Sequence, residues 1–305
     1  MDASATRRTA LENTHPLRVA SPRTPGPGRE ERVRTLAKIC ADDLVSSFGL
    51  HKTGALGSLL RLVASVPSQR LGGQIATYDD IVGEAGLSAG GAWALEQMAR
   101  EVVVKGRVPR EGPLLVVSNH PGLADAVALF AAMPREDLRV IAAERPFLSA
   151  LPNTSRALIP VKETPGGRSG AARVAARHLK RGGAVITFPG GKIEPDPAVL
   201  PGAVAALGAW SGSVDLFARL VPDLTVVPAV VSGVISRAAL RNPLNRIRSD
   251  PRDREWLAAT FQMLVPALRN VTTRVEFGPS VSAAADEPVS RRVVEEAKRI
   301  IEGAR

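Results

Sequence analysis

The sequence has a single cysteine, Cys40, in 305 residues. One cysteine cannot form an intrachain disulfide, and no second cysteine or histidine stands at metal-ligand spacing, so the sequence predicts neither a disulfide framework nor a metal site. Aromatic residues are also scarce, at 4% of the chain, whereas hydrophobic residues make up 45%. Leucine, valine and alanine must therefore supply the core packing.

Long hydrophobic runs are absent as well. No stretch reaches the roughly 18 to 20 apolar residues that cross a bilayer, and the richest run, LVPDLTVVPAVVSGVI, is cut by Asp223 and two prolines. The N-terminus has no apolar segment behind its arginines, so we do not expect a secretory signal. We interpret residues 1–32 as a disordered basic leader. We expect a cytoplasmic protein that associates peripherally with the inner face of the membrane.

Negative charge is in deficit, because 40 Lys and Arg face 30 Asp and Glu, for a net charge of +10. This excess suits anionic partners such as acidic lipids or phosphorylated substrates. Six arginines lie in the stretch SRAALRNPLNRIRSDPRDR. The stretch fits a loop that faces an anionic membrane surface, a site for the coenzyme A phosphates, or a solvated, salt-bridged loop. Nucleic acid is not expected as a partner, because the stretch has no aromatic side chain on which bases would stack.

Hydrophobic periodicity divides the ordered chain into two parts at about residue 100. Residues 33–100 predict a helical region, which starts with a helix whose apolar face holds Val33, Leu36, Ala37, Cys40, Leu44 and Val45. We expect the next apolar stretch, residues 55–66, to pack on the main domain rather than lie on a membrane surface. A third helix over residues 78–100 is interrupted by GLSAGG.

From residue 101 to 305, strands alternate with helices, which predicts an α/β domain: a mixed, largely parallel sheet flanked by helices, preceded by the N-terminal helical extension. The predicted strands are residues 101–108, 110–120, 138–144, 184–191, 224–234 and 272–281. The predicted helices are residues 122–133, 167–183, 214–220 and 253–265, followed by a last amphipathic helix whose apolar face holds Val293, Val294, Ala297, Ile300 and Ile301.

The stretch VVSNHPGLAD places His120 at the end of a predicted strand and Asp125 in the first turn of the next helix. A histidine acts as a base when a carboxylate on one ring nitrogen fixes the tautomer and leaves the other nitrogen free. Alternatively, Asn119 and Asp125 cap the helix and His120 is a bystander. The pattern alone leaves both interpretations open.

Four ordered segments, VVVKGRVPREGPLLVVSNHPGLAD, ALIPVKE, GGAVITFPGGK and LTVVPAVVSGV, resemble the four motifs of the glycerolipid, or lysophospholipid, acyltransferase superfamily. Typical members acylate glycerol 3-phosphate or 1-acylglycerol 3-phosphate. The resemblance implies that His120 deprotonates an acceptor hydroxyl and that Asp125 orients His120. The hydroxyl then attacks an acyl thioester carried by coenzyme A or acyl carrier protein, which is a co-substrate, so that no cofactor and no acyl-enzyme are implied. Amides at the helix start or in the glycine turn are expected to hold the oxyanion.

The third motif departs from the family pattern, in which Phe-Pro-Glu-Gly-Thr-Arg-Ser is usual. Here Gly190 stands at the position of the Glu and Ile193 at that of the Arg. Lys192 and Glu194 stand close enough to restore a cation and a carboxylate. Two explanations stand: Lys162, Arg168 and Lys192 bind the acceptor phosphate instead, or the acceptor is not a simple glycerol phosphate. A third interpretation is a plain glycine turn beside a solvated lysine. The residues that we expect to shape the site and line the acceptor pocket are Asn119, Lys162, Arg168, Phe188, Pro189, Gly190, Gly191, Lys192 and Glu194.

The sequence therefore predicts an O-acyltransferase that acylates a lysophospholipid or related lipid. The alternative is an acyl- or lipid-binding protein of the same fold that has lost activity through its altered third motif.

Overall fold

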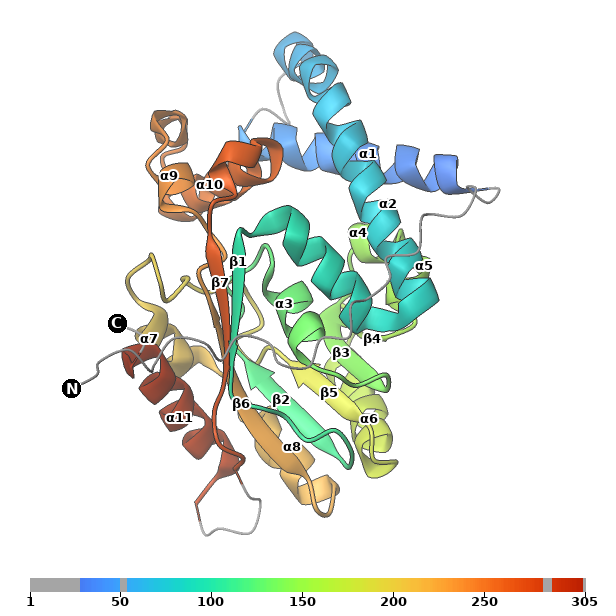
Figure 1. Ribbon diagram of the computed structural model, residues 1–305, viewed down its shortest axis with the longest axis vertical. Coiled ribbons are helices and arrows are strands. Elements are labelled where there is room, and N and C mark those ends of the chain that lie inside the picture. The colour runs from blue at the N-terminus through green and yellow to red at the C-terminus, as the bar shows by residue number, and fades with distance from the viewer. Residues whose placement is uncertain (1–27, 50–53, 282–286, 304–305) are drawn as a thin grey trace, which may run out of the picture.

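A computed structural model describes residues 28–49, 54–281 and 287–303. Its centre is a seven-stranded sheet in the order β1-β7-β6-β2-β5-β3-β4, in which every neighbouring pair is parallel except β6 and β7 (Figure 1). The strands are β1 (Glu101–Lys105), β2 (Leu114–Ser118), β3 (Leu138–Ala143), β4 (Leu158–Val161), β5 (Ala184–Thr187), β6 (Thr225–Ser232) and β7 (Thr272–Phe277). The predicted fold class, a mixed and largely parallel sheet flanked by helices, is confirmed.

Helices cover both faces of this sheet. They are α3 (Asp125–Ala132), α4 (Pro146–Ser149), α5 (Pro152–Ser155), α6 (Gly167–Lys180), α7 (Ala203–Ala206), α8 (Ser213–Leu220), α9 (Arg237–Leu240), α10 (Pro251–Leu264) and α11 (Val289–Gly303), with 3-10 turns at Leu207–Ala209, Pro243–Ile247 and Pro266–Leu268. The predicted apolar face of α11 is confirmed, because Val293, Ala297 and Ile301 are almost fully buried.

The central strands β2 and β5 are buried along their whole length, as expected for parallel strands with helices on both sides. Successive residues of a strand point to opposite faces. Leu114 and Val116 of β2 accordingly join the core beneath α3, and Leu115 and Val117 join the core beneath α6 and α8. The sheet is therefore the middle layer of three, and the ends of its central strands are held rigidly.

Two helices, α1 (Arg29–Ser47) and α2 (Gly54–Met98), form the N-terminal region. The first helix begins inside the stretch predicted to be a disordered leader, four residues before Val33, and the rest of that leader, residues 1–27, lies outside the described residues. The two helices cross closely at Gly72, where a Cβ atom would lie 2.8 Å from the backbone nitrogen of Ala37. Helix α2 is broken at Gly86 (φ 83°, ψ 173°), within the interruption that the sequence predicted.

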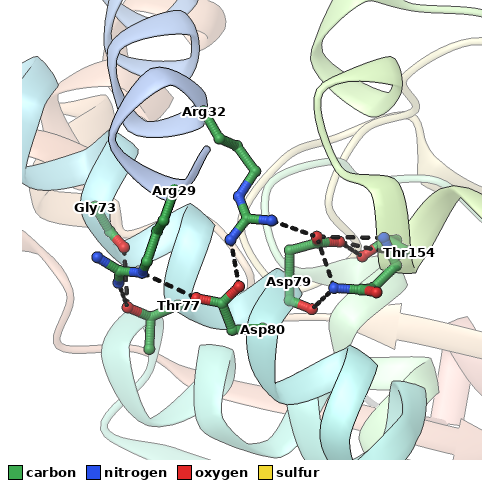
Figure 2. A network of polar contacts seen from close by, with 8 residues as sticks. Arg29, Arg32, Gly73, Thr77, Asp79, Asp80 and Thr154 are labelled. Carbon is green, nitrogen blue, oxygen red and sulfur yellow. Dashed lines mark hydrogen bonds and ion pairs between the residues drawn. The ribbon is translucent and has the colours of Figure 1, made fainter. Parts of the chain in front are cut away.

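A buried carboxylate fastens the N-terminal helices to the sheet domain (Figure 2). Asp79 of α2 is fully buried, and its Oδ1 accepts hydrogen bonds of 2.8 Å from both the backbone N–H and the hydroxyl of Thr154 in α5. Arg32 of α1 approaches the other oxygen at 3.8 Å and also pairs with Asp80. One side chain thus joins α1, α2 and the connection between β3 and β4.

Three segments differ from what the sequence analysis predicted. In the stretch at residues 55–66, the side chains described are those from Arg61 onward, and Leu62, Val63 and Val66 among them are 70%, 68% and 65% exposed instead of packed on the main domain, because this part of α2 projects beyond the sheet (Figure 1). The arginine-rich stretch is not a plain loop, since it contains α9 and the turn Pro243–Ile247. Strand β4 was not predicted, because its four residues include Pro160. Among the described helices, none has both the length and the apolar character that a membrane crossing requires.

Candidate active site

The candidate site lies at the carboxyl ends of the central strands β2, β5 and β6. His120 follows the last residue of β2 by two positions, and Asp125 is the first residue of α3. Phe188 and the glycine turn follow β5 directly. In open α/β sheets, ligands bind in the crevice beyond these strand ends.

His120 and Asp125 are brought together as the spacing suggested. His120 Nδ1 lies 2.7 Å from Asp125 Oδ2. Because an ionised carboxylate only accepts hydrogen bonds, Nδ1 carries the proton in this contact and Nε2 of the neutral ring is free to accept one. The Asp125 carboxylate is 3% exposed and the imidazole 30% exposed, so the carboxylate is buried from solvent while the ring is partly exposed.

The backbone of the intervening loop makes this contact possible. Gly122 (φ 83°) and Leu123 (φ 55°) are both left-handed, which turns the chain back between the histidine and the helix. A left-handed leucine costs about 1–2 kcal/mol. Asp125 Oδ2 also accepts the N–H of Gly122 at 2.8 Å, so the carboxylate holds the turn as well as the ring.

The pKa of His120 is raised above the ordinary 6.5. Burial of the ring opposes the charged form and is the largest single effect. It is outweighed by the hydrogen bond and negative charge of Asp125 together with the charge of Glu194. The ring of Phe188 stacks on the imidazole, with 4.6 Å between ring centroids. The site therefore stabilises the imidazolium form more than water does, and the ring remains partly exposed.

Asn119, one of the residues expected to shape the site, is held by β6. Its Nδ2 donates to the carbonyl of Val231 at 2.9 Å, and its Oδ1 accepts the N–H of the same residue at 2.7 Å. The residue is 2% exposed. Asn119 thus fixes the end of β2 against β6, directly before His120.

The FPGG stretch forms a tight turn, as one of the three interpretations held. The N–H of Gly191 donates to the carbonyl of Phe188 at 3.1 Å, and Gly191 adopts a φ of 66°. Pro189 is buried, and its carbonyl accepts the N–H of Ser211. The turn therefore carries Phe188 to His120 and is itself held by the segment that precedes α8.

Glu194 is the second carboxylate of the site, and it is 6% exposed. Its Oε1 accepts the indole N–H of Trp210 at 2.9 Å, and its backbone N–H donates to the carbonyl of His120 at 2.8 Å. Burial raises the pKa of Glu194, against the lowering effects of the Trp210 and His120 hydrogen bonds and of the His120 charge. The sequence analysis missed Trp210, which stands between the third and fourth motifs and reaches the site only through the fold.

The predicted cations do not gather around His120. Lys162 and Arg168 are exposed and follow β4, at the edge of the sheet, which β3 separates from β5. Glu163, beside Lys162, pairs with Arg145 on the surface. Lys192 is exposed on the glycine turn. Of these three predicted phosphate ligands, only Lys192 lies on a segment that contacts the histidine loop.

Asp196 is a second residue that the sequence analysis missed, and it anchors the loop after β5. Its carboxylate is 1% exposed and accepts four backbone N–H groups, from Ala198, Gly233, Val234 and Ile235, at 2.7 to 3.2 Å. The loop that carries Glu194 is thereby fixed to the chain that leaves β6.

Two of the amides expected to bind an oxyanion are already engaged. The N–H of Gly122 and that of Ala126 both donate to the carboxylate of Asp125.

No group of three or more potential metal ligands occurs in the described part of the chain. Two surface hollows of about 500 and 520 Å³ lie beside Phe277 and beside Arg135, and neither is lined by His120.

Residues 100–232 match the sequence profile of the acyltransferase family, which spans the chain from the start of β1 to the end of β6. A search of curated proteins gave no match. A structure search found the 1-acyl-sn-glycerophosphate (LPA) acyltransferase PlsC of Thermotoga maritima at 17% identity and a TM-score of 0.42, covering 88% of this chain and 97% of that chain.

Proposed function

We propose that this protein is an O-acyltransferase that moves a fatty acyl group from an acyl thioester to a hydroxyl of a lysophospholipid or related lipid, and the match of residues 100–232 to the acyltransferase family supports this proposal. Coenzyme A or acyl carrier protein carries the acyl group. One observation supports the assignment most strongly: a 2.7 Å contact fixes His120 as the Nδ1 tautomer, with a reachable ring at the carboxyl end of β2.

In the proposed reaction, Nε2 of His120 takes the proton of the acceptor hydroxyl as its oxygen bonds to the thioester carbonyl carbon. The tetrahedral intermediate then breaks the C–S bond. The proton on His120 passes to the departing sulfur, which leaves as a thiol. Asp125 remains ionised throughout and stabilises the imidazolium. The thioester is already activated, so no acyl-enzyme is needed.

The test is thiol release from acyl-coenzyme A and acyl carrier protein donors, offered with a panel of lysolipid and glycerol phosphate acceptors, and product identification by mass spectrometry. A general base contributes roughly 10²- to 10⁴-fold, so His120→Ala should lower transfer by at least that factor, to background. Asp125→Asn, which keeps the geometry but removes the charge that orients the ring, should lose most of the rate. Tight binding of donor or lipid without turnover by the wild type would favour the binding-protein alternative. An active His120→Ala enzyme would overturn the mechanism.

The altered third motif bears on the acceptor. No cation occupies the position of the family Arg, and Ile193, which does, is 60% exposed. A site with an exposed aliphatic side chain at that point suits a less phosphorylated or more apolar acceptor than 1-acylglycerol 3-phosphate. The acceptor panel distinguishes the two explanations of the altered motif. If nearby cations bind the acceptor phosphate, 1-acylglycerol 3-phosphate should be preferred, and if the acceptor is less phosphorylated, it should not.

We also propose that the protein works at an anionic membrane surface. The exposed side chains of Leu62, Val63 and Val66 adjoin Arg61 on α2, and such a mixture of apolar and cationic groups partitions to the lipid interface. Helix α10, which follows the arginine-rich segment, packs on α1 through an edge-to-face contact of Phe261 with Phe48. That segment exposes Ile247 among its arginines and lies on the same side of the molecule as the projecting end of α2 (Figure 1).

A further inference from the structure

Glu194 is tied to His120 although it stands outside the histidine motif. It lies in the loop after β5, which crosses to the end of β2, where its backbone N–H donates to the carbonyl of His120 at 2.8 Å. The two ionisable side chains therefore belong to segments that are bonded to each other. Asp125, from α3, is bonded to the imidazole directly, with 2.7 Å between its Oδ2 and Nδ1 of the ring.

Gly190 leaves the room in which the Glu194 carboxylate sits. A Cβ atom at position 190 would lie 2.0 Å from Glu194 Oε1, well inside van der Waals contact. Any other residue at 190 would displace that oxygen, and with it the acceptor of the Trp210 indole. Gly190 and Glu194 thus act as a pair: the absence of a side chain at one position allows the carboxylate of the other to be buried there.

Burying a carboxylate costs free energy unless other groups compensate for the lost hydration. One indole N–H at 2.9 Å offsets part of that cost for Glu194. The positive charge of His120, on the segment to which Glu194 is hydrogen-bonded, also lowers the pKa of Glu194, and the charge of Glu194 raises the pKa of His120. Each group therefore favours the charged form of the other.

We infer that Glu194 is a positioning residue that, together with Asp125, stabilises the imidazolium formed when His120 takes the acceptor proton. The inference rests on the proposed function. In that step the hydroxyl proton moves to Nε2 while the O–C bond forms, and it leaves on the sulfur when the C–S bond breaks. Glu194 neither gains nor loses a proton; its fixed negative charge makes His120 a stronger base.

The experiment is an NMR titration of the His120 ring in the full-length protein, with wild type compared to Glu194→Gln. An amide oxygen at 194 still accepts the Trp210 N–H, so the variant removes the charge and keeps the hydrogen bond. We expect the pKa of His120 to fall in Glu194→Gln. Glu136→Gln, a matched change at an exposed carboxylate, should leave that pKa unchanged.

Two further variants separate charge from structure. Glu194→Asp retains the charge and should hold the pKa of His120 above that in Glu194→Gln. Trp210→Phe removes the hydrogen bond but leaves the carboxylate, and it should also keep the pKa above that of Glu194→Gln. If the pKa of His120 is the same in Glu194→Gln and wild type, the inference is overturned.

Kinetics provide the second measurement. On the pH plateau above the acid limb, we expect kcat of Glu194→Gln to be roughly tenfold lower than that of the wild type, which corresponds to an activation free energy higher by about 1.4 kcal/mol. We also expect the acid limb of the pH profile to move to lower pH. A purely structural role would lower kcat without moving the limb, and this result would contradict the inference. The titration itself needs no turnover, so it decides the role of Glu194 separately from the proposed function.

Discussion

At the scale of single residues, the site depends on side chains that are anchored on their inner side and open on their outer side. His120 donates from Nδ1 to a carboxylate that is 3% exposed, while its ring is 30% exposed. The side-chain amide of Asn119, the preceding residue, forms both of its hydrogen bonds with the backbone of Val231 in β6. The inner contacts fix position, and the exposed face of the imidazole is left for the reaction.

The raised pKa of His120 predicts the pH dependence of acyl transfer. A base must be unprotonated to act, and the folded-state pKa lies above 6.5, so kcat/KM should rise with pH with a midpoint above 6.5. The contribution of His120 to folding stability has the opposite trend: it is full below 6.5 and is lost as pH rises through the folded-state pKa. Initial rates from pH 5 to 9 check the first statement, and a midpoint at or below 6.5 would contradict it.

Asp196 predicts a large effect on stability. Asp196→Ala leaves four backbone N–H groups without their acceptor, and buried unsatisfied groups cost about 1–3 kcal/mol each before relaxation. We expect the free energy of unfolding in urea to fall by at least about 3 kcal/mol. Asp42→Ala, which removes a half-exposed carboxylate paired with Arg61, serves as the control and should change it by less than about 0.5 kcal/mol. Equal effects in the two variants would refute the anchoring role.

At the scale of elements, the sequence predicted what periodicity and strand chemistry control. Strands β2, β5 and β6 are apolar runs bounded by turns, and α11 has one apolar face, so each was predicted at nearly its observed place. Strand β4 was missed because four residues that include Pro160 carry too little pattern. The end of α2 was predicted to be buried because its apolar residues resemble a core face, and sequence periodicity cannot tell which partner covers that face.

The candidate site divides in the same way. The contact of His120 with Asp125 was predictable, because the two are five residues apart and a strand-to-helix turn brings them together. The carboxylate of Glu194 at the site was raised only as a replacement for the Glu of the third motif. Its bonds to His120 and Trp210 join β2, β5 and the segment before α8, and no local pattern specifies such tertiary contacts.

The attachment of α2 to the sheet domain gives a prediction at this scale. Asp79→Ala removes the acceptor of two 2.8 Å hydrogen bonds from Thr154 and should loosen both N-terminal helices. We expect faster hydrogen exchange across α1 and α2 with little change in β2 and β5, and a loss of about 2–4 kcal/mol in unfolding free energy. Asp80→Ala provides the comparison, because its side chain is 33% exposed and ion pairs of that kind contribute about 1 kcal/mol or less. Uniform exchange across the whole chain would contradict the prediction.

At the scale of the whole molecule, positive charge is distributed unevenly over the surface. The projecting end of α2 exposes apolar side chains, and its Arg61 is paired with Asp42. Exposed arginines, among them Arg241 and Arg246, lie in the segment that precedes α10. Helix α11, at the opposite end in Figure 1, carries several carboxylates paired with its own Lys and Arg. Surface charge steers a protein toward anionic surfaces only where it is not neutralised locally. In the proposed membrane-bound state, the arginine-rich segment and the apolar end of α2 therefore face the lipid.

Vesicle binding tests this orientation. The protein should sediment with vesicles that contain anionic lipid and much less with neutral ones, and added salt should weaken binding because it screens the arginines. Burying one exposed Leu or Val contributes about 1.5–3 kcal/mol, so the double change of Leu62→Ser and Val63→Ser should lower the partition coefficient by at least about tenfold. Val174→Ser is the matched control, since Val174 is 45% exposed on α6, away from the N-terminal helices. If both variants bind vesicles like the wild type, a membrane role for the end of α2 is excluded, and if only the control loses binding, the opposite face of the molecule meets the lipid.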